Sequence, residues 1–154
     1  MEESQSIGAM YYMWRYRHLV DDKRRVSIPS QWRPAEPGTV LTLVVWPKSN
    51  EGICLRVLPP KKMESVAKDL EMMPNDDPNK PILKRYFGSQ ATQVTLDKVG
   101  RITIPEEMAQ LAGLEKDAIL VGVVDAFEIW NPSRYDRVKN SDAIMAQEAF
   151  KRME

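Results

Sequence analysis

The sequence predicts a mixed α+β fold, mainly β, built from one unit present in two tandem copies and flanked by helices. The first observation is a repeated motif: residues 20–29 and 96–105 both read apolar, Asp, three residues, Arg, apolar, polar, Ile, Pro. The second is that strand-like apolar runs follow each motif. The third is size, because a unit of roughly 50 residues buries too little apolar surface alone. Two copies closing on each other as a pseudo-symmetric β-barrel are therefore expected.

The predicted strands come in corresponding pairs. Runs 41–45 and 53–58 of the first copy correspond to runs 118–124 and 126–130 of the second. The first copy holds about four more residues between its paired runs, in a predicted hairpin loop at 47–52, where insertions are well tolerated. Ahead of the first motif, aromatic and basic residues alternate in a pattern typical of a strand over 12–20.

Helices are predicted between and after the copies. Residues 60–72 carry Met63, Val66, Ala67 and Leu70 at helical spacing, and a second helix is expected over 80–87. Asn75, Asp76, Asp77 and Pro78 separate the two. The tail, 132–153, predicts an amphipathic helix that docks on the barrel or on a neighbouring subunit.

The segment after each motif is predicted to differ between the copies. In the first copy, Pro34 and Pro37 should restrict residues 30–38 to about one helical turn. In the second copy a helix is expected after Pro105, ending at Gly113. Its inner face would consist of Met108, Leu111 and Ala112.

These elements predict five segments. They are a flexible N-terminal arm (1–10), repeat 1 (11–62), a helical connector (63–90), repeat 2 (91–134) and a C-terminal helix or tail (135–154).

Composition argues against several classes of function. The chain has 22 basic and 22 acidic residues, so only local charge can indicate a partner. The single cysteine, Cys54, lies in a predicted strand and is expected to be buried in a protein of a reducing compartment. The lone histidine, His18, is expected to pack or to contact backbone rather than bind metal. With no glycine-rich phosphate loop either, we expect no enzyme, cofactor, metal or small-molecule substrate. Without an apolar leader or a membrane-spanning run, we expect a cytoplasmic protein.

The repeated motif has the chemistry of an aimed arginine. Asp97 can accept from the amides of its own turn or from Arg101, and Gly100 suits a positive φ. Asp21 is the matching residue of the first copy. A guanidinium held in one rotamer loses less entropy when it binds phosphate or guanine. A single motif of this kind would more often merely staple a hairpin.

The candidate DNA-binding residues are the cations on and around the two turns. They are Arg15, Arg17, Lys23, Arg24, Arg25, Lys98 and Arg101, with Asp21, Asp97 and Gly100 orienting them. Because the basic residues gather around the first copy, we expect that copy to make the main DNA contact and the second to be partly structural.

The chain resembles the MraZ family of bacterial transcription factors. The resemblance rests on residues 21–29, 97–105 and 114–130, and it covers roughly 12–137. It implies an AbrB-like, swapped-hairpin β-barrel with two Asp-x-x-x-Arg repeats. It also implies a ring-shaped homo-oligomer, octamer-type, on double-stranded DNA of the nucleoid. The targets would be direct repeats in the promoter of the division and cell-wall gene cluster, and the effect autoregulatory repression.

Some residues depart from the family pattern and leave the DNA sequence preference open. Arg24 and Trp14 stand where the family tends to have glycine, and Arg15 and Arg17 stand where acidic residues are common. Three alternatives remain: a ring-forming scaffold whose DNA face has drifted, a nonspecific nucleoid protein, and an AbrB-like antitoxin. Antitoxins of that class usually carry one copy of the motif, whereas this chain has two.

Overall fold

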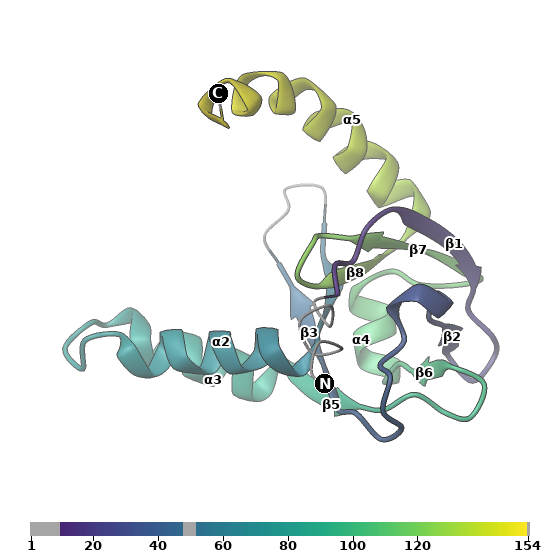
Figure 1. Cartoon of the computed structure of the whole chain (residues 1–154), viewed down its shortest axis with the longest axis horizontal. Coiled ribbons are helices and arrows are strands. Elements are labelled where there is room, and N and C mark those ends of the chain that lie inside the picture. Colours follow the sequence, from purple (N-terminus) through teal and green to yellow (C-terminus); the bar gives the residue numbers. More distant parts are fainter. Residues whose placement is uncertain (1–9, 48–51, 154) are drawn as a thin grey trace, which may run out of the picture.

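The computed structural model describes residues 10–47 and 52–153, and its centre is a six-stranded antiparallel sheet (Figure 1). The strands lie in the order β1-β7-β8-β4-β3-β5. In chain order they are β1 (Arg15–Leu19), β3 (Leu41–Trp46), β4 (Cys54–Leu58), β5 (Ala91–Val94), β7 (Asp117–Gly122) and β8 (Phe127–Trp130). A separate antiparallel ribbon is formed by β2 (Arg25–Ser27) and β6 (Arg101–Thr103).

The two repeats exchange strands. From the first repeat, β1 pairs with β7 of the second, and from the second repeat, β5 pairs with β3 of the first. The ribbon joins one strand from each repeat, with Val26 opposite Ile102 at its centre. Neither repeat therefore completes its sheet without the other, and the two share one core.

The ribbon closes over that core through its apolar side chains. Val26, Ile28, Ile102 and Ile104 are at most 1% exposed and belong to the same cluster as the inner face of the sheet. Trp32 lies at the centre of this cluster, with its ring edge-on to Tyr16 at 5.2 Å and next to Phe127 at 4.9 Å. At about 25 cal/mol per Å² of apolar surface, this burial holds the ribbon against the sheet.

The segments after the two motifs differ as predicted. In the first repeat, a single 3-10 turn, η1 (Ser30–Trp32), precedes Pro34. In the second, α4 (Glu106–Leu111) makes a short helix, and Gly113 follows it at φ 68°. The predicted inner face of α4 is wrong at one position: Leu111 is 37% exposed, whereas Ala109 is 5% exposed. The buried face consists of Met108, Ala109 and Ala112, which lie on one side of the helical turn.

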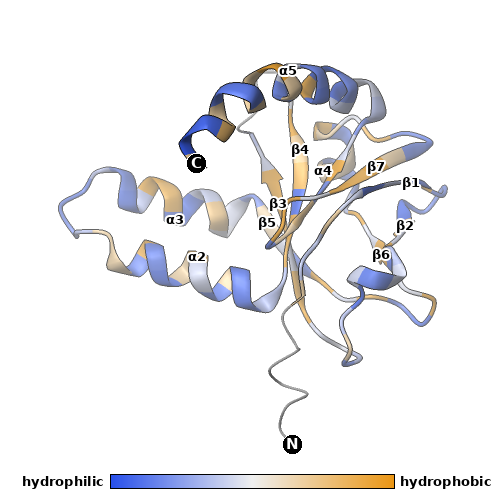
Figure 2. Ribbon diagram, turned by 45° about the horizontal axis from the view of Figure 1, so that its top comes forward, coloured by the Kyte–Doolittle hydropathy of each residue, from blue (hydrophilic) through white to orange (hydrophobic). Residues whose placement is uncertain are grey.

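A pair of helices leaves the sheet between the repeats. They are α2 (Pro60–Met72) and α3 (Asn79–Ser89), which lie side by side and extend away from the strands (Figures 1 and 2). The buried Lys80 ammonium donates to the carbonyls of Glu71 and Met73 and so closes the end of α2. Tyr86 anchors α3 by donating to the carbonyl of Val45 in β3.

The C-terminal helix begins on the sheet and then leaves it. α5 (Pro132–Phe150) is capped by Asn131, which accepts from the backbone N–H of Arg134, and η2 (Lys151–Met153) ends it. Arg134 also donates to the carbonyls of Ile53 and Leu111. Beyond this anchored first turn the helix curves away from the strands (Figure 1), with Phe150 63% exposed.

The mixed α+β class is confirmed, with 39% of the described residues helical and 28% in strands. The strands supply most of the buried apolar side chains, so "mainly β" describes the core rather than the residue count. The predicted arm (1–10, except Met10) and most of the inserted loop lie outside the described residues. Within the described part of the chain, no helix is long and apolar enough to cross a membrane.

Candidate nucleic-acid interface

The first turn is held by one carboxylate. Oδ1 of Asp21 accepts from the backbone N–H groups of Lys23 at 3.0 Å and Arg25 at 2.8 Å. Oδ2 of Asp21 accepts from Nε of Arg25 at 2.8 Å. The Asp21 carbonyl accepts from the N–H of Arg24 at 2.9 Å, which closes the turn. The aspartate thus fixes both the turn and the guanidinium that follows it.

The second turn repeats this arrangement. Oδ1 of Asp97 accepts from the N–H groups of Val99 at 3.0 Å and Arg101 at 2.9 Å, and Oδ2 accepts from Nε of Arg101 at 2.8 Å. Gly100 donates to the Asp97 carbonyl at 3.0 Å. Both hydrogen-bonding roles predicted for the aspartate are present, and the two turns match bond for bond.

Both carboxylates are held in the charged form. The backbone N–H of Arg25 is the largest cause, and the Arg25 guanidinium adds to it, so the pKa of Asp21 lies below its ordinary value of 3.8. The N–H and the guanidinium of Arg101 lower the pKa of Asp97 in the same way. Hydrogen bonds to the charged form favour that form. At neutral pH each arginine therefore faces a full negative charge.

The ribbon brings the two motifs together. Because β2 and β6 are antiparallel, with Arg25 opposite Thr103 and Ser27 opposite Arg101, the two arginines lie near each other. A guanidinium nitrogen of Arg101 lies 4.0 Å from Oδ2 of Asp21. We call Asp21, Arg25, Asp97 and Arg101 the Asp–Arg cluster. Both arginine side chains are 31% exposed, so each keeps part of its guanidinium open to a ligand.

The tips of the turns flank the cluster. Lys23 and Lys98 are exposed, as expected of cations that would meet a phosphate backbone. Val99, which corresponds to Lys23, is 58% exposed. The first tip thus presents Asp22 and Lys23, whereas the second presents Lys98 and an apolar surface of the kind that can contact a thymine methyl group.

Arg24 differs from Arg25 and Arg101 because its side chain bonds to a backbone carbonyl of the other repeat rather than to the aspartate of its own turn. Its backbone keeps the positive φ of the family glycine, at 60°. Its Nε donates to the carbonyl of Ile104, in the other repeat, at 3.0 Å. The strain of a non-glycine residue in this region is on the order of 1 kcal/mol. The residue that carries this strain also donates the hydrogen bond to the Ile104 carbonyl.

Arg15 and Arg17 lie apart from the ribbon. Both are on the outer face of β1, beside the first turns of α5. The Arg15 guanidinium lies 4.4 Å from the centre of the Trp14 ring, and Arg17 pairs with Asp117 at 2.6 Å. Trp14 has a φ of 79°, which explains why glycine is common at its position. Of the predicted DNA-binding residues, these two are not gathered with the Asp–Arg cluster.

His18 and Cys54 have the structural roles expected of them. Nδ1 of His18 lies 2.5 Å from the carbonyl of Ser27 and so connects β1 to the ribbon. Cys54 is 1% exposed in β4, and burial raises the pKa of its thiol far above the ordinary value.

One residue beside the turns was missed by sequence reasoning. Arg33 donates from Nε to the carbonyl of Ile28 at 2.8 Å, and its guanidinium lies against Gly100. The only sequence signal was its place before Pro34, which favours an extended backbone but does not name the contact.

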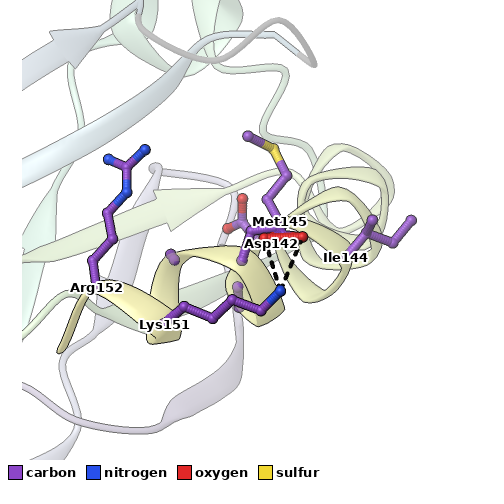
Figure 3. Close-up of a pocket in the computed structure, with 8 residues that line it drawn as sticks. Asp142, Ile144, Met145, Lys151 and Arg152 are labelled. Atoms are coloured by element: carbon purple, nitrogen blue, oxygen red, sulfur yellow. Dashed lines mark hydrogen bonds and ion pairs between the residues drawn. The ribbon is translucent and has the colours of Figure 1, made fainter. Parts of the chain in front are cut away.

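A hollow away from the ribbon has a different chemistry. A hollow of about 830 Å³ runs along the inner curve of α5 and η2, where Lys151 pairs with Glu148 (Figure 3). Its lining comes from these two elements alone and includes Ile144 and Met145. Among the described residues, no group of three or more His, Cys, Asp or Glu side chains is placed to hold a metal ion.

Comparison with known proteins identifies the family. A family described as "MraZ protein, putative antitoxin-like" matches residues 87–153, which hold the second motif and α5. A protein of Thermomicrobium roseum called "Transcriptional regulator MraZ" is 35% identical over 127 residues, which is 80% of this chain and 84% of that protein. The chain belongs to the MraZ family.

Other MraZ relatives match to a similar extent. A protein of the same name from Lachnoclostridium phytofermentans is 34% identical over 125 residues, covering 81% of this chain and 84% of its own. Another from Deinococcus radiodurans is 34% identical over 122 residues, covering 79% of this chain and 82% of its own. All of these relatives are named transcriptional regulators, and the family match over 87–153 includes the second turn of the Asp–Arg cluster.

Proposed function

We propose that this chain is a sequence-specific DNA-binding transcriptional regulator whose ribbon, β2 and β6, meets the double helix. The observation that carries the proposal is the Asp–Arg cluster, in which two matched arginines are aimed from neighbouring turns. Arginine forks of this kind donate two parallel bonds to guanine or to phosphate. Names of the relatives in the family support a role in transcription.

The distribution of charge supports the same face. The two turns, residues 21–25 and 97–101, carry five cationic side chains and three acidic ones. Two of the acids are the orienting aspartates, whose charges are already paired. Lys23 and Lys98 would supply phosphate contacts, which give affinity, while Arg25 and Arg101 would supply specificity.

We propose that the active form is a ring-shaped homo-oligomer, octamer-type. Each chain has one ribbon, so one subunit would read only a short stretch of DNA. A ring would present the same ribbon several times, which suits direct repeats in a promoter. The proposed targets are the repeats ahead of the division and cell-wall gene cluster that includes its own gene, with autoregulatory repression. The site of action would then be the cytoplasm, at the nucleoid.

The test is fluorescence anisotropy on two duplexes: the region upstream of the chain's own gene and a scrambled sequence. Titrations at about 50 and 200 mM salt should show steep weakening, as expected for phosphate contacts. Arg25→Ala should abolish the preference for the native duplex, and Arg101→Ala should reduce it less, because Val99 replaces a lysine at the second tip. Arg85→Ala, on the exposed face of α3, removes the same charge and should change nothing.

The outcomes separate the alternatives. Equal affinity for both duplexes would indicate a nonspecific nucleoid protein. No binding by an assembled ring would indicate a scaffold. Loss of binding with Arg15→Ala or Arg17→Ala, but not with Arg25→Ala, would move the interface to the outer face of β1.

A further inference from the structure

Each turn is bound to the opposite repeat through a matching isoleucine. The N–H of Ile28 donates to the carbonyl of Gly100 at 2.9 Å, and the N–H of Ile104 donates to the carbonyl of Arg24 at 2.9 Å. Gly100 and Arg24 occupy the same position in their turns, the fourth residue counted from the aspartate. The place of each turn therefore depends on a strand end that lies in the other half of the molecule.

The carbonyls of the same two isoleucines accept from arginines that come from different places. The Ile104 carbonyl accepts from Arg24, which belongs to the first turn itself. The Ile28 carbonyl accepts from Arg33, which lies after η1. Each bond joins a guanidinium Nε to a backbone oxygen, at 3.0 and 2.8 Å. The two halves thus contain the same bond, made by non-equivalent residues.

Arg33 and Arg24 fill corresponding spaces, one beside each turn. A Cβ atom on Gly100 would lie 2.3 Å from Cζ of Arg33, closer than any real contact. In the first turn, the corresponding space beside the backbone is filled by the side chain of Arg24 itself. The position that corresponds to Arg33 in the second repeat is Ala109, which is 5% exposed inside α4. Each half therefore has one arginine and one small residue at these two positions. The first turn has Arg24 on the turn and Ala109 at the second position, whereas the second turn has Gly100 on the turn and Arg33 at the second position.

The local sequence explains why Arg33 reaches the turn. The residue before a proline is pushed to an extended backbone, and Arg33, before Pro34, has φ −78° and ψ 135°. Because η1 is only one turn long, Arg33 leaves it beside the ribbon. In the second repeat the corresponding position is buried within a regular helix, where a long charged side chain would be excluded.

We propose that Arg33 and Arg24 are positioning residues that lock the two DNA-contacting turns. Arg24 ties the first turn to Ile104 of the other repeat, whereas Arg33 is bonded to Ile28 of its own repeat and lies against Gly100 of the second turn. Each turn keeps a left-handed fourth residue, at φ 60° in Arg24 and 87° in Gly100. Locking fixes the direction of Arg25 and Arg101, which lowers the entropy lost on binding. The effect on DNA binding rests on the proposed function, whereas the locking of the turns rests on the geometry of the protein alone.

The test exploits the opposite order of arginine and small residue. Arg33→Ala removes the guanidinium cap of the second half. Gly100→Arg on its own places a second side chain in the space that Arg33 fills and should be harmful. In the double variant, Arg33→Ala with Gly100→Arg, the second turn copies the first, and the new arginine should cap Ile28 as Arg24 caps Ile104. Gly100→Arg should therefore destabilise the second turn in the wild-type background and restore it in the Arg33→Ala background.

Amide hydrogen exchange of the free protein gives the first measurement, independent of DNA. Arg33→Ala should speed exchange of the Ile28 amide about tenfold, because local opening becomes easier. The double variant should return it toward the wild-type rate, and the charge-matched control Arg85→Ala should leave it unchanged. If the double variant exchanges as fast as Arg33→Ala or faster, the positioning role is overturned. That result is obtained even if the protein binds no DNA.

DNA affinity on the upstream duplex gives the second measurement. Arg33→Ala should weaken binding about tenfold, with the slope of log affinity against log salt unchanged. Losing a phosphate contact would instead make that slope shallower by about 0.9. A shallower slope would overturn the proposal and make Arg33 a direct DNA contact. Failure of the wild-type protein to bind would refute the proposed function. The exchange measurement would still test whether Arg33 positions the second turn.

Discussion

The two Asp–Arg turns are nearly identical in their hydrogen bonds and different in what surrounds them. In both, one aspartate accepts from two amides and from the Nε of the arginine four residues later. The first turn has Arg24 at its left-handed position, whereas the second has Gly100 with Arg33 beside it. The comparison teaches that the repeat preserves an arrangement of bonds rather than a set of residues. A side chain lost at one position of a turn is supplied from another segment.

The largest expected effect concerns the isoleucines to which the turns are attached. Ile28 and Ile104 are both fully buried, so replacing either with alanine should lower the free energy of unfolding by about 2–5 kcal/mol. The two losses should agree because the two halves share one core. Urea denaturation measures them. A loss below about 1 kcal/mol at one site alone would show that the halves are not equivalent.

The second expected effect separates the two aspartates. Asp21 lies near both arginines, at 2.8 Å from Arg25 and 4.0 Å from Arg101, so Asp21→Asn should release Arg25 and weaken the hold on Arg101, which stays bonded to Asp97. The preference for the native over the scrambled duplex should fall about tenfold in Asp21→Asn and about threefold in Asp97→Asn. A preference ratio is the right measurement, because removing a negative charge also strengthens nonspecific attraction to DNA. A larger loss in Asp97→Asn would reverse the ranking.

A third, smaller effect compares the left-handed positions. Gly100→Ala should lower the free energy of unfolding by at least about 1 kcal/mol, because alanine disfavours a positive φ and its Cβ would displace the Arg33 guanidinium. Arg24→Gly should change it by about 0.5 kcal/mol or less, since relief of strain offsets the lost bond to Ile104. Thermal or chemical denaturation decides between them. Equal losses would mean that Arg24 is not strained in the way its φ suggests.

The smallest expected effect is on pH dependence. The pKa values of Asp21 and Asp97 are lowered on folding, so each stabilises the fold above its ordinary pKa. That contribution is lost as the pH falls through the folded pKa, in a window below about pH 5. Asp125, whose pKa is lowered mainly by its bond to Lys62, contributes in the same direction.

Denaturation midpoints between pH 6 and the acid limit measure this dependence. The double variant Asp21→Asn with Asp97→Asn should lose stability less steeply with falling pH than wild type. An unchanged profile would assign the acid sensitivity to other carboxylates.

The sequence was sufficient for what depends on local patterns. The two motifs, the strands that follow them and the helix at 60–72 were all predicted, because repeats, alternation and proline positions are visible in neighbouring residues. Contacts between the repeats were not. Arg24 bonds to a residue 80 positions away, and no local signal indicates that its guanidinium turns inward.

Two other differences have the same origin. Arg15 and Arg17 were grouped with the turns because they are close in sequence, but β1 carries them to the outer face beside α5. Arg33 was passed over because its role depends on Gly100, from the other repeat. Packing between distant segments decides both placements.

Crosslinking to DNA from single cysteines tests the central claim most directly. Cys54 is buried and has a raised thiol pKa, so an introduced thiol can be modified selectively with a photo-crosslinker. Lys23→Cys and Val99→Cys place it at the two turn tips, and Ile82→Cys, 54% exposed on α3, is the matched control. Crosslinks to the upstream duplex from both tips, and none from position 82, are the expected result. Crosslinks from position 82, or from neither tip while the duplex is bound, would contradict a DNA interface on the β2–β6 ribbon.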